Sequence, residues 1–509
     1  MLPLFKTKGL NQLLAESARP EQQLKRTLGP LQLTFLGIGA IVGAGIFSTV
    51  GTAAAGGADH LGAGPALVVS FVLVAVACGF AALCYAEFAA MVPVSGSAYT
   101  YAYATLGELM AWIIGWDLML EYAIGNVAVA ISWSAYFQEL LRGVGLDLPT
   151  WLGTDYRSAF QAFHQVAAAQ AAHTDMSTFS AGVLRDAQAW GQAPHLLGLP
   201  VILNLPALLV VAAITWILVR GIRETAGCNT IFVVLKLAII VFFLGLGAFY
   251  VKPENWTPFA PNGFAGISSA AAIIFFAYIG FDAISTAAEE SRNPQRDMPI
   301  GIIASLVVCT VIYLAVAVVL TGLADWKTLG TAEPLASVFS ALGMNWTAGI
   351  ISVGALFATT SVLIAFQMGQ PRIFFSMARD GLLPAWAARV HPRYRTPHIT
   401  TILTGVLVAA FSTVTNINEM VELTNIGTLF AFILVAVGIL VLRYTDPNRP
   451  RPFKTPLVPW VPIGAILSCG YLMAELPKVT WIRFGLWLGL GLVIYLFYGM
   501  HKSKLRGDP

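Results

Sequence analysis

The stretch Gly37-Ile-Gly-Ala-Ile-Val-Gly-Ala-Gly-Ile-Phe47 places four glycines in an apolar run that otherwise resembles a membrane-spanning helix. Lipid cannot hydrogen-bond backbone N–H and C=O groups, so a helix at membrane depth breaks only where the freed groups face protein or a cavity. A second interrupted stretch, Phe275-Phe-Ala-Tyr-Ile-Gly-Phe-Asp282, lies far downstream. Two interrupted spans in two halves of a chain are typical of a substrate site within a membrane.

The composition indicates an all-α polytopic membrane protein. Of the 509 residues, 57% are hydrophobic and only 11% are charged, and the mean hydropathy is +0.74. Soluble domains carry about 25% charged residues. Apolar runs of spanning length, about 17–25 residues, predict twelve transmembrane helices. They lie at 31–50, 65–86, 104–138, 199–219, 227–250, 265–286, 300–323, 346–371, 398–415, 424–442, 459–476 and 481–500.

The distribution of Lys and Arg predicts that both termini are cytoplasmic. With the N-terminus inside, 21 of the 29 basic residues fall in inside segments, 7 fall outside and Lys236 lies within a span. Loops with an excess of Lys and Arg lie on the cytoplasmic side of membrane proteins, so the inside segments are assigned to the cytoplasm. The net charge of +3 therefore reflects membrane topology and does not indicate nucleic-acid binding.

The regions outside the spans are short, with one exception. Residues 1–29 predict a cytoplasmic leader with an interfacial helix rather than a cleavable signal peptide, because they lack an apolar core. Residues 142–198 form an external polar insert with one or two amphipathic helices around 158–192. If the two breaks correspond, 30–250 and 265–443 are repeats of five spans each, followed by 459–500 and a cytoplasmic tail at 501–509.

The first break offers complementary charges to a zwitterion. Unwinding at Gly43-Ala44-Gly45 exposes amides at the start of the outer half-helix, which favour a carboxylate. Carbonyls near Ile41 and Val42 end the inner half and favour an ammonium. Because a free α-amino acid carries both groups, we expect a substrate site here, while close helix packing through small residues is the alternative.

The second break supplies the other side of this site. Unwinding at Ile279-Gly280 frees the carbonyls of Phe276 and Ala277 for an ammonium, and the ring of Phe276 could cover the ligand. Asp282 follows and can bind a proton or a cationic group. Packing against lipid or a neighbouring helix is the alternative role for the aromatic ring.

Charges within spans cost about 2.5–3.5 kcal/mol each and are usually functional. Lys236 lies too deep in the fifth span for its side chain to reach water, and its ammonium can stand where a sodium ion would otherwise bind. Reversible protonation there would couple transport to protons; a permanent structural charge is the alternative. Asp117 and Glu121 share one face of the third span. Glu121 could balance Lys236, take a proton, meet a basic substrate side chain or make a structural hydrogen bond.

These residues resemble the amino acid–polyamine–organocation superfamily, and most closely its cationic amino acid transporter branch. The resemblance covers nearly the whole chain and rests on several blocks together. They are Gly37–Phe47, Pro93–Tyr99, Gly115–Tyr122, Phe276–Glu290, Asn293–Pro299, Pro371-Arg372, Met377–Pro384 and Asn425–Phe430.

The resemblance implies a LeuT-like fold of two inverted five-helix repeats with two extra C-terminal helices, working by alternating access. It implies that the amides of Gly43, Ala44 and Gly45 bind the substrate carboxylate, and that carbonyls of Ile41, Phe276 and Ile279 bind the amine. Phe276 matches the family's gating aromatic residue, and Lys236 matches the lysine that replaces sodium in proton-coupled relatives. Thr359, Thr360 and Ser361 keep sodium coupling open as an alternative.

We therefore predict a carrier that imports L-amino acids across the cytoplasmic membrane by proton symport. An amino-acid exchanger is one alternative, and a non-transporting amino-acid sensor is another. No nucleophile is arranged with a base and no phosphate-binding loop is present, so we expect neither enzyme activity nor a cofactor, and no His or Cys spacing predicts a metal. The sequence leaves open a cationic or neutral substrate, the oligomeric state, the role of the insert and a small membrane-protein partner.

Overall fold

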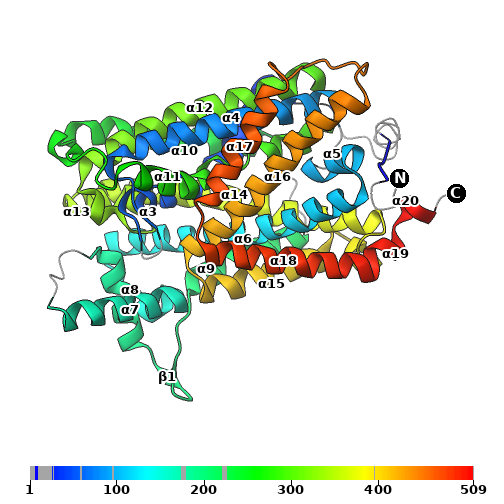
Figure 1. The fold of residues 1–509 in the computed structure, drawn as a ribbon. Coiled ribbons are helices and arrows are strands. Elements are labelled where there is room, and N and C mark those ends of the chain that lie inside the picture. Colours follow the sequence, from blue (N-terminus) through cyan, green and yellow to red (C-terminus); the bar gives the residue numbers. More distant parts are fainter. Residues whose placement is uncertain are drawn as a thin grey trace.

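The computed structural model describes residues 6–9, 26, 28–57, 60–93, 97–173, 179–220, 226–394 and 396–507. Long helices run side by side along one direction, with the two termini near one end and the insert helices at the other (Figure 1). The predicted leader at 1–29 lies largely outside the described residues, as does the end of the tail at 501–509.

Within the described residues, eight segments are long and apolar enough to cross a membrane, and a bent pair makes a ninth. The bent pair consists of α2 (Pro30–Ile41) and η2 (Gly45–Thr49) with α3 (Val50–Ala55). Five of the eight segments are built on one long helix each: α6 (Glu108–Gly143), α10 (Ala226–Gly247), α12 (Pro294–Leu323), α14 (Asn345–Arg379) and α16 (Ile417–Thr445). The other three combine consecutive elements: η3 (Gly64–Ala66) with α4 (Leu67–Met91); α11 (Gly263–Ile274) with η8 (Phe275–Tyr278) and η9 (Asp282–Glu290); and α18 (Lys478–Ile494) with η12 (Tyr495–Gly499) and α19 (Met500–Lys502).

Three shorter apolar helices fall on the other three of the twelve ranges expected from the sequence. They are α9 (Leu205–Arg220), α15 (His398–Val414) and α17 (Trp460–Ala474). The prediction of a mostly helical protein with many apolar spans is thus confirmed. Boundaries differ where local geometry breaks the chain: the third long helix begins at Glu108 rather than 104 because Gly107 adopts a φ of 94°.

Short elements connect the long helices. Among the shorter helices are α5 (Ser97–Thr105), α13 (Pro334–Ala341) and α20 (Lys504–Gly507). Short 3₁₀ turns lie at η4 (Thr150–Leu152), η6 (Ala248–Tyr250), η7 (Pro253–Trp256), η10 (Trp326–Leu329) and η11 (Ala385–Ala388).

The insert contains two helices and a small hairpin. α7 (Tyr156–Ala171) and α8 (Ala181–Gln192) confirm the two-helix version of the expectation. The strands β1 (His195–Leu196) and β2 (Leu199–Pro200) were not expected from the sequence. Positive φ angles at Leu197 and Gly198 close this two-residue turn.

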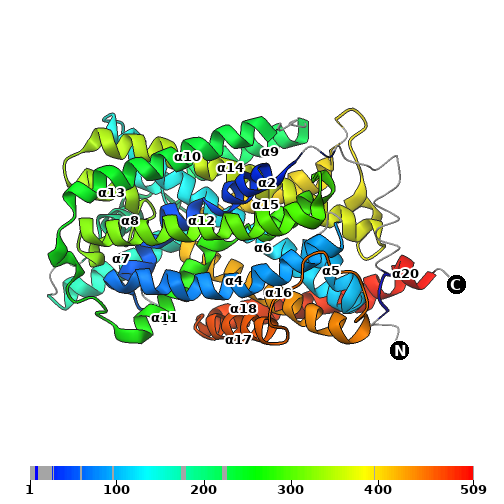
Figure 2. The ribbon, with the colours of Figure 1, turned by 90° about the horizontal axis from the view of Figure 1, so that it is seen from above.

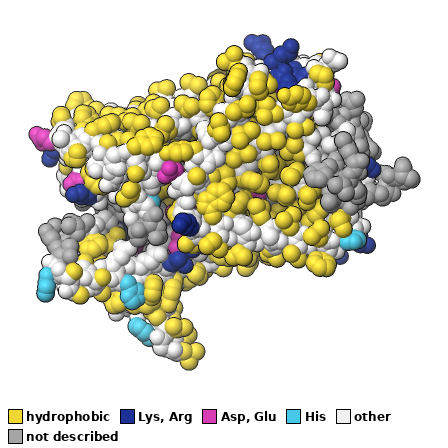
Figure 3. Space-filling model, in the orientation of Figure 1, with side chains coloured by type: hydrophobic (Ala, Val, Ile, Leu, Met, Phe, Trp, Pro, Cys, Tyr) yellow, Lys and Arg dark blue, Asp and Glu magenta, His cyan; other side chains and the backbone are white. Residues whose placement is uncertain are grey.

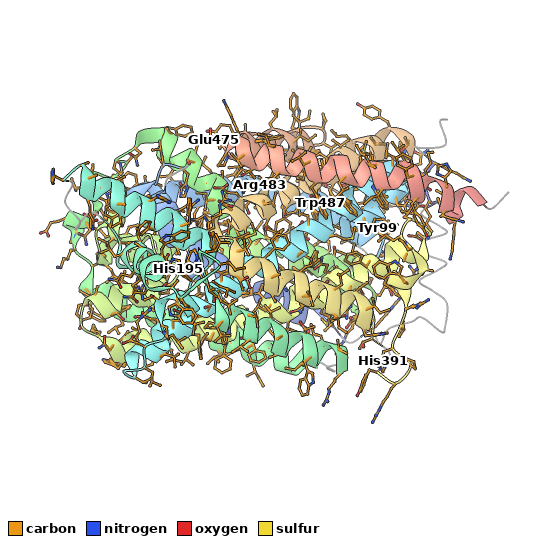
Figure 4. The ribbon with its side chains drawn as sticks, turned by 90° about the horizontal axis from the view of Figure 1, so that it is seen from below. Tyr99, His195, His391, Glu475, Arg483 and Trp487 are labelled. Atoms are coloured by element: carbon orange, nitrogen blue, oxygen red, sulfur yellow. The ribbon has the colours of Figure 1, made fainter. Side chains whose placement is uncertain are left out.

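The bundle is held together by the packing of α6, which runs against α14 and α16, while α2 packs on α12 and α10 (Figure 2). Near the C-terminus, Trp487 of α18 stacks on Trp116 of α6 with ring centroids 4.4 Å apart. Each indole N–H donates to the other residue's carbonyl, at 2.9 and 3.1 Å. Trp487 and Arg483 lie along α18 in Figure 4, and Arg483 also pairs with Glu419 of α16. The last long helix is thereby fixed to the centre of the bundle.

Hydrophobic side chains cover most of the face seen in Figure 3, as expected for a surface in contact with lipid. The histidines in this view lie toward the two ends of the molecule rather than in the apolar region between them. No group of His, Cys, Asp and Glu within the described residues could hold a metal ion.

The insert should lose stability as pH rises. Asp155 caps α7 by accepting from the backbone N–H of Ser158 at 2.7 Å. Burial raises the pKa of Asp155 to about 7, although hydrogen bonds from Ser158 act in the opposite direction. The pKa of an aspartate in an unfolded chain is about 3.9. Between that pH and about 7, the folded insert therefore holds a proton that the unfolded segment releases. The stability that protonated Asp155 contributes to the insert is therefore fully present below about pH 4 and is lost as pH rises toward about 7.

We expect backbone amides of α7 to exchange faster with deuterium at pH 8 than at pH 5, after correction for intrinsic rates. Asp155→Asn retains a good N-cap but cannot titrate, so its protection should depend less on pH than that of the wild type, with the remaining dependence due to Asp186, whose pKa burial raises to about 6. Equal pH dependence in the variant and the wild type would contradict this assignment.

Candidate functional site

The first helix is broken where its glycines predict. α2 ends at Ile41, Val42 adopts an extended conformation with φ −77° and ψ 97°, and the chain resumes as the π-helical turn η2 at Gly45. The two halves are bent by 43°. The first N–H groups of a helix have no partner within it, so the amides at Gly43, Ala44 and Gly45 begin the second half in the position that favours an anion.

The second break also lies where the sequence predicts it. α11 ends at Ile274 and tightens into the 3₁₀ turn η8, after which Ile279 is extended with ψ 136°. Gly280 has a φ of 119°, a conformation that side chains with a Cβ rarely adopt. The chain resumes at Asp282 as η9. The carboxylate of Asp282 accepts the N–H of Gly280 at 3.2 Å, so this side chain bonds the backbone of the break itself.

The two breaks touch each other through their glycines. A Cβ added at Gly45 would lie 2.2 Å from the Cα of Ala277, and one added at Gly280 would lie 2.8 Å from the carbonyl carbon of Ala40. Both distances are far shorter than real contacts allow. The glycines therefore permit the backbones of the two interrupted helices to approach directly. The close packing through small residues that the sequence left open as one alternative is therefore present.

Lys236 of α10 reaches the first break and is fully buried. Its Nζ donates to the carbonyl oxygens of Gly39 at 2.7 Å and Val42 at 2.9 Å, and to the hydroxyl of Ser361 in α14 at 3.1 Å. These carbonyls belong to the last turn before the break. One ammonium thus joins three helices at the point where the backbone of the first helix is open.

Hydroxyl and amide side chains occupy other carbonyls that the breaks free. Tyr313 of α12 donates to the carbonyl of Ile41 at 3.1 Å. Asn425 of α16 donates to the carbonyls of Ala272 and Ile273, at 2.7 and 3.0 Å, where α11 ends. Neither role was expected from the sequence. A polar residue that recurs opposite both breaks would reveal such a role in the sequence. A single Tyr or Asn in an apolar helix has no distinctive spacing and does not.

Two of the carbonyls expected to hold a substrate amine already accept a hydrogen bond. The carbonyl of Ile41 already accepts from Tyr313, and that of Phe276 accepts from the N–H of Ile279 at 3.4 Å. A carbonyl oxygen has two lone pairs, so each can accept one further hydrogen bond. The Val42 carbonyl, which accepts from Lys236, likewise keeps one lone pair.

The acidic residues differ in their surroundings. Glu121 is buried on the face of α6 that also carries Ser132, whose hydroxyl bonds Ser48 of η2. Its carboxyl lies within electrostatic range of Asp282 at the second break and of Asp117 on its own helix. Asp117 lies against α16, where a Cβ at Gly427 would approach its Oδ1 to 2.6 Å. Both carboxyl oxygens of Asp117 are buried without a hydrogen bond within the described residues.

The second half of the broken helix is tied down on the side of the insert. Ser48 bonds Ser132 and the carbonyl of Ala332, and Tyr136 donates to the carbonyl of Phe47. Farther out, Glu333 pairs with Arg142 of α6 at 3.1 Å and with Arg185 of the insert helix α8 at 2.8 Å. These contacts connect the second half of the broken helix to α6 and, through the neighbouring residues Ala332 and Glu333, to the insert helix α8.

The structure therefore brings the predicted residues together. The two breaks contact each other, Lys236 bonds the first and Asp282 bonds the second, and Glu121 lies within electrostatic range of Asp282. The side chains of Phe276, Ile279 and Asp282 are buried, as is that of Ala277.

An apolar helical bundle with two interrupted helices at its centre defines a multi-pass membrane carrier. The model of the amino acid permease family matches residues 28–496. The chain is 45% identical to the branched-chain amino acid permease BcaP of Bacillus subtilis, over 99% of each chain. It is 43% identical to the methylthioribose transporter of the same bacterium, over 99% of this chain and 100% of that protein. It is also 36% identical to cationic amino acid transporter 4 of Mus musculus, over 86% of this chain and 62% of the mouse protein.

The chain therefore belongs to the amino acid permease family, within the amino acid–polyamine–organocation superfamily. This confirms the resemblance found in the sequence and the prediction of a transporter rather than an enzyme. The family and the apolar helices together make it a multi-pass membrane protein.

The contact between the breaks predicts the effect of one methyl group. Gly45→Ala would force its Cβ into the backbone of Ala277. Overpacking of this kind typically costs about 1–3 kcal/mol, and here it would also displace the amides of the first break. We expect a lower melting temperature in detergent and loss of substrate uptake.

Gly79→Ala in α4 is the matched control, because a Cβ at Gly79 meets nothing within 4 Å. It should retain uptake and melt at or above the wild-type temperature, since alanine favours a helix over glycine. Wild-type uptake by Gly45→Ala would show that the two breaks do not depend on this contact.

Proposed function

We propose that this protein imports L-amino acids across the cytoplasmic membrane by proton symport, through alternating access. The observation that carries the proposal is the Lys236 ammonium bound by the Gly39 and Val42 carbonyls and the Ser361 hydroxyl. Two backbone carbonyls and a hydroxyl are oxygen ligands that would equally suit a sodium ion. A titratable lysine in their midst makes the proton the coupling ion instead.

Proton coupling follows if Lys236 loses its proton during the transport cycle. The charged lysine holds the end of α2 against α10 and α14. A neutral amine would retain fewer hydrogens to share among the same three oxygens, and would release the first helix. Movement of that helix is what alternating access requires, because its broken segment lines the substrate site.

The substrate site proposed here is the space beside the two breaks. The amides of Gly43, Ala44 and Gly45 bind the carboxylate, and carbonyls of Ile41, Phe276, Ala277 and Ile279 are available to the ammonium. Phe276 covers the ligand as a gate. Glu121 and Asp282 would accept a proton or a basic side chain, which leaves both neutral and cationic amino acids as substrates.

The finer architecture belongs to the same proposal. Ten helices would form two inverted repeats of the LeuT type, at 30–250 and 265–443, with α17 and α18 as the two extra helices. Twelve helices then cross the membrane, the insert faces outward and both termini face the cytoplasm. The correspondence of the two breaks and the bias of basic residues support this arrangement.

The relatives suggest two classes of substrate. Their names include branched-chain and cationic amino acids and, for one Bacillus protein, methylthioribose. Methylthioribose has neither a carboxylate nor an ammonium, so it would leave the exposed amides of the first break without an anion. Amino acids therefore fit the site better, and methylthioribose is the second candidate.

Substitution of the buried lysine tests the coupling. In proteoliposomes, Lys236→Gln should abolish accumulation of labelled amino acid driven by a pH gradient, because its amide can still donate to the carbonyls but cannot titrate. Exchange of labelled for unlabelled substrate should survive and shows that the variant is folded. Unchanged pH-driven accumulation would refute the role of Lys236, whereas wild-type uptake that ignores a pH gradient would identify an exchanger.

The carboxylate site predicts the effect of removing one charge from the substrate. Alanine, leucine, arginine, lysine, glutamate and methylthioribose should be compared as competitors for one labelled substrate, together with leucinamide. Leucinamide should compete at least about tenfold more weakly than leucine, since a charge-assisted hydrogen bond is worth about 1.5–3 kcal/mol. Equal competition by the amide would argue against the carboxylate site. Competition by methylthioribose alone would replace the amino-acid proposal.

A further inference from the structure

A groove of about 740 Å³ lies on the outer side of α12, against the connection between α16 and α17. Asn293, Gln295 and Arg296 line it at the start of α12. Ile300, Ile303 and Val307 continue it along the helix, and Phe453 forms part of the opposite wall. This groove is separate from the broken helices and from the residues assigned to transport.

The length of the groove matches one leaflet of a membrane. Arg296 and Val307 are eleven positions apart, and a helix rises about 1.5 Å per residue, so they are separated by about 16 Å along the axis. Half of a typical hydrocarbon core is about 15 Å. The polar residues lie at the start of α12, and the apolar ones follow them along the helix. Val307 is 55% exposed and Ile300 is 40% exposed.

The charge at the polar end is positive. Arg296 is the charged residue among those that line the groove, and Lys454 follows Phe453 in the chain; both side chains are exposed. The acid on the same turn of α12, Asp297, is buried and accepts the N–H of Asn293 at 3.2 Å.

Two basic residues of the connection between α16 and α17 have acidic partners. Arg449 pairs with Asp446 and Arg451 with Glu87. In the part of the chain that the structure describes, neither Arg296 nor Lys454 makes an ion pair. Figure 3 shows Lys and Arg side chains gathered over the connection between α16 and α17, at the border of the apolar surface.

We propose that this groove binds one phospholipid with an anionic headgroup. The headgroup phosphate contacts Arg296 and Lys454, and an acyl chain follows Ile300, Ile303 and Val307 to the middle of the bilayer. A groove that is basic at the membrane surface and apolar along one leaflet complements such a lipid at both ends. A free anion would use only the basic end, and a second protein copy would need a partner for the two unpaired cations.

Native mass spectrometry of the purified, delipidated full chain tests the proposal. We expect phosphatidylglycerol to bind more tightly than phosphatidylcholine with the same acyl chains. Removal of one cation near a membrane surface weakens attraction to an anionic lipid about fivefold. Arg296→Gln should therefore bind phosphatidylglycerol about fivefold more weakly, and the double variant with Lys454→Gln weaker again. Ala304→Trp keeps both charges but fills the apolar part, and should reduce binding of either lipid.

Arg389→Gln, an exposed position outside the groove, is the matched control and should bind as the wild type does. Equal affinity for the two lipids, or wild-type affinity in the double variant, would overturn the proposal. Competition by glycerol phosphate at the concentrations at which the lipid binds would show a small-anion site instead. A dimer that persists without lipid and is broken by Ala304→Trp would assign the groove to contact between two copies.

Discussion

The hydrogen bonds of Lys236 are the interaction on which the centre of this structure depends. An interrupted helix inside an apolar bundle leaves carbonyl groups that neither lipid nor the helix itself can satisfy. The Lys236 ammonium satisfies two of them, at Gly39 and Val42, and extends to Ser361 on a third helix. Without a donor at this position, the break would expose unpaired polar groups in a fully buried place, at a cost of about 1–3 kcal/mol each.

The two breaks form one structural unit because glycines let their backbones meet. Gly45 allows contact with Ala277, and Gly280 allows contact with Ala40 while taking a φ of 119°. Asn425, Tyr313 and Asp282 then bond the backbone groups that the breaks release. The unit is therefore stabilised by polar side chains from the surrounding helices.

Much of this arrangement could be predicted from the sequence, because it follows from strong local signals. Glycines within an apolar run identify both breaks, and a lysine deep in a span has few alternatives to binding carbonyls. Its partner Ser361 was recognised as a hydroxyl that suits a cation, although pairing with Lys236 was not deduced. The twelve apolar ranges fall on the helices because hydropathy over about twenty residues records burial in lipid.

Other features depend on which helices become neighbours, and a single sequence does not contain that information. The bonds of Tyr313 to Ile41 and of Asn425 to the end of α11 join residues more than 150 positions apart. The hairpin at 195–200 rests on positive φ angles at one leucine and one glycine. The connection of the insert to Glu333 through Arg185 likewise requires the folded bundle.

The central claim is that a lysine, rather than a sodium ion, provides the cation at the first break. It is tested most directly by measuring amino-acid accumulation in proteoliposomes with one ion gradient at a time. An inward proton gradient in sodium-free potassium buffer should drive accumulation, and an inward sodium gradient at equal pH should give only equilibration. Accumulation driven by sodium, with none driven by protons, would contradict the account.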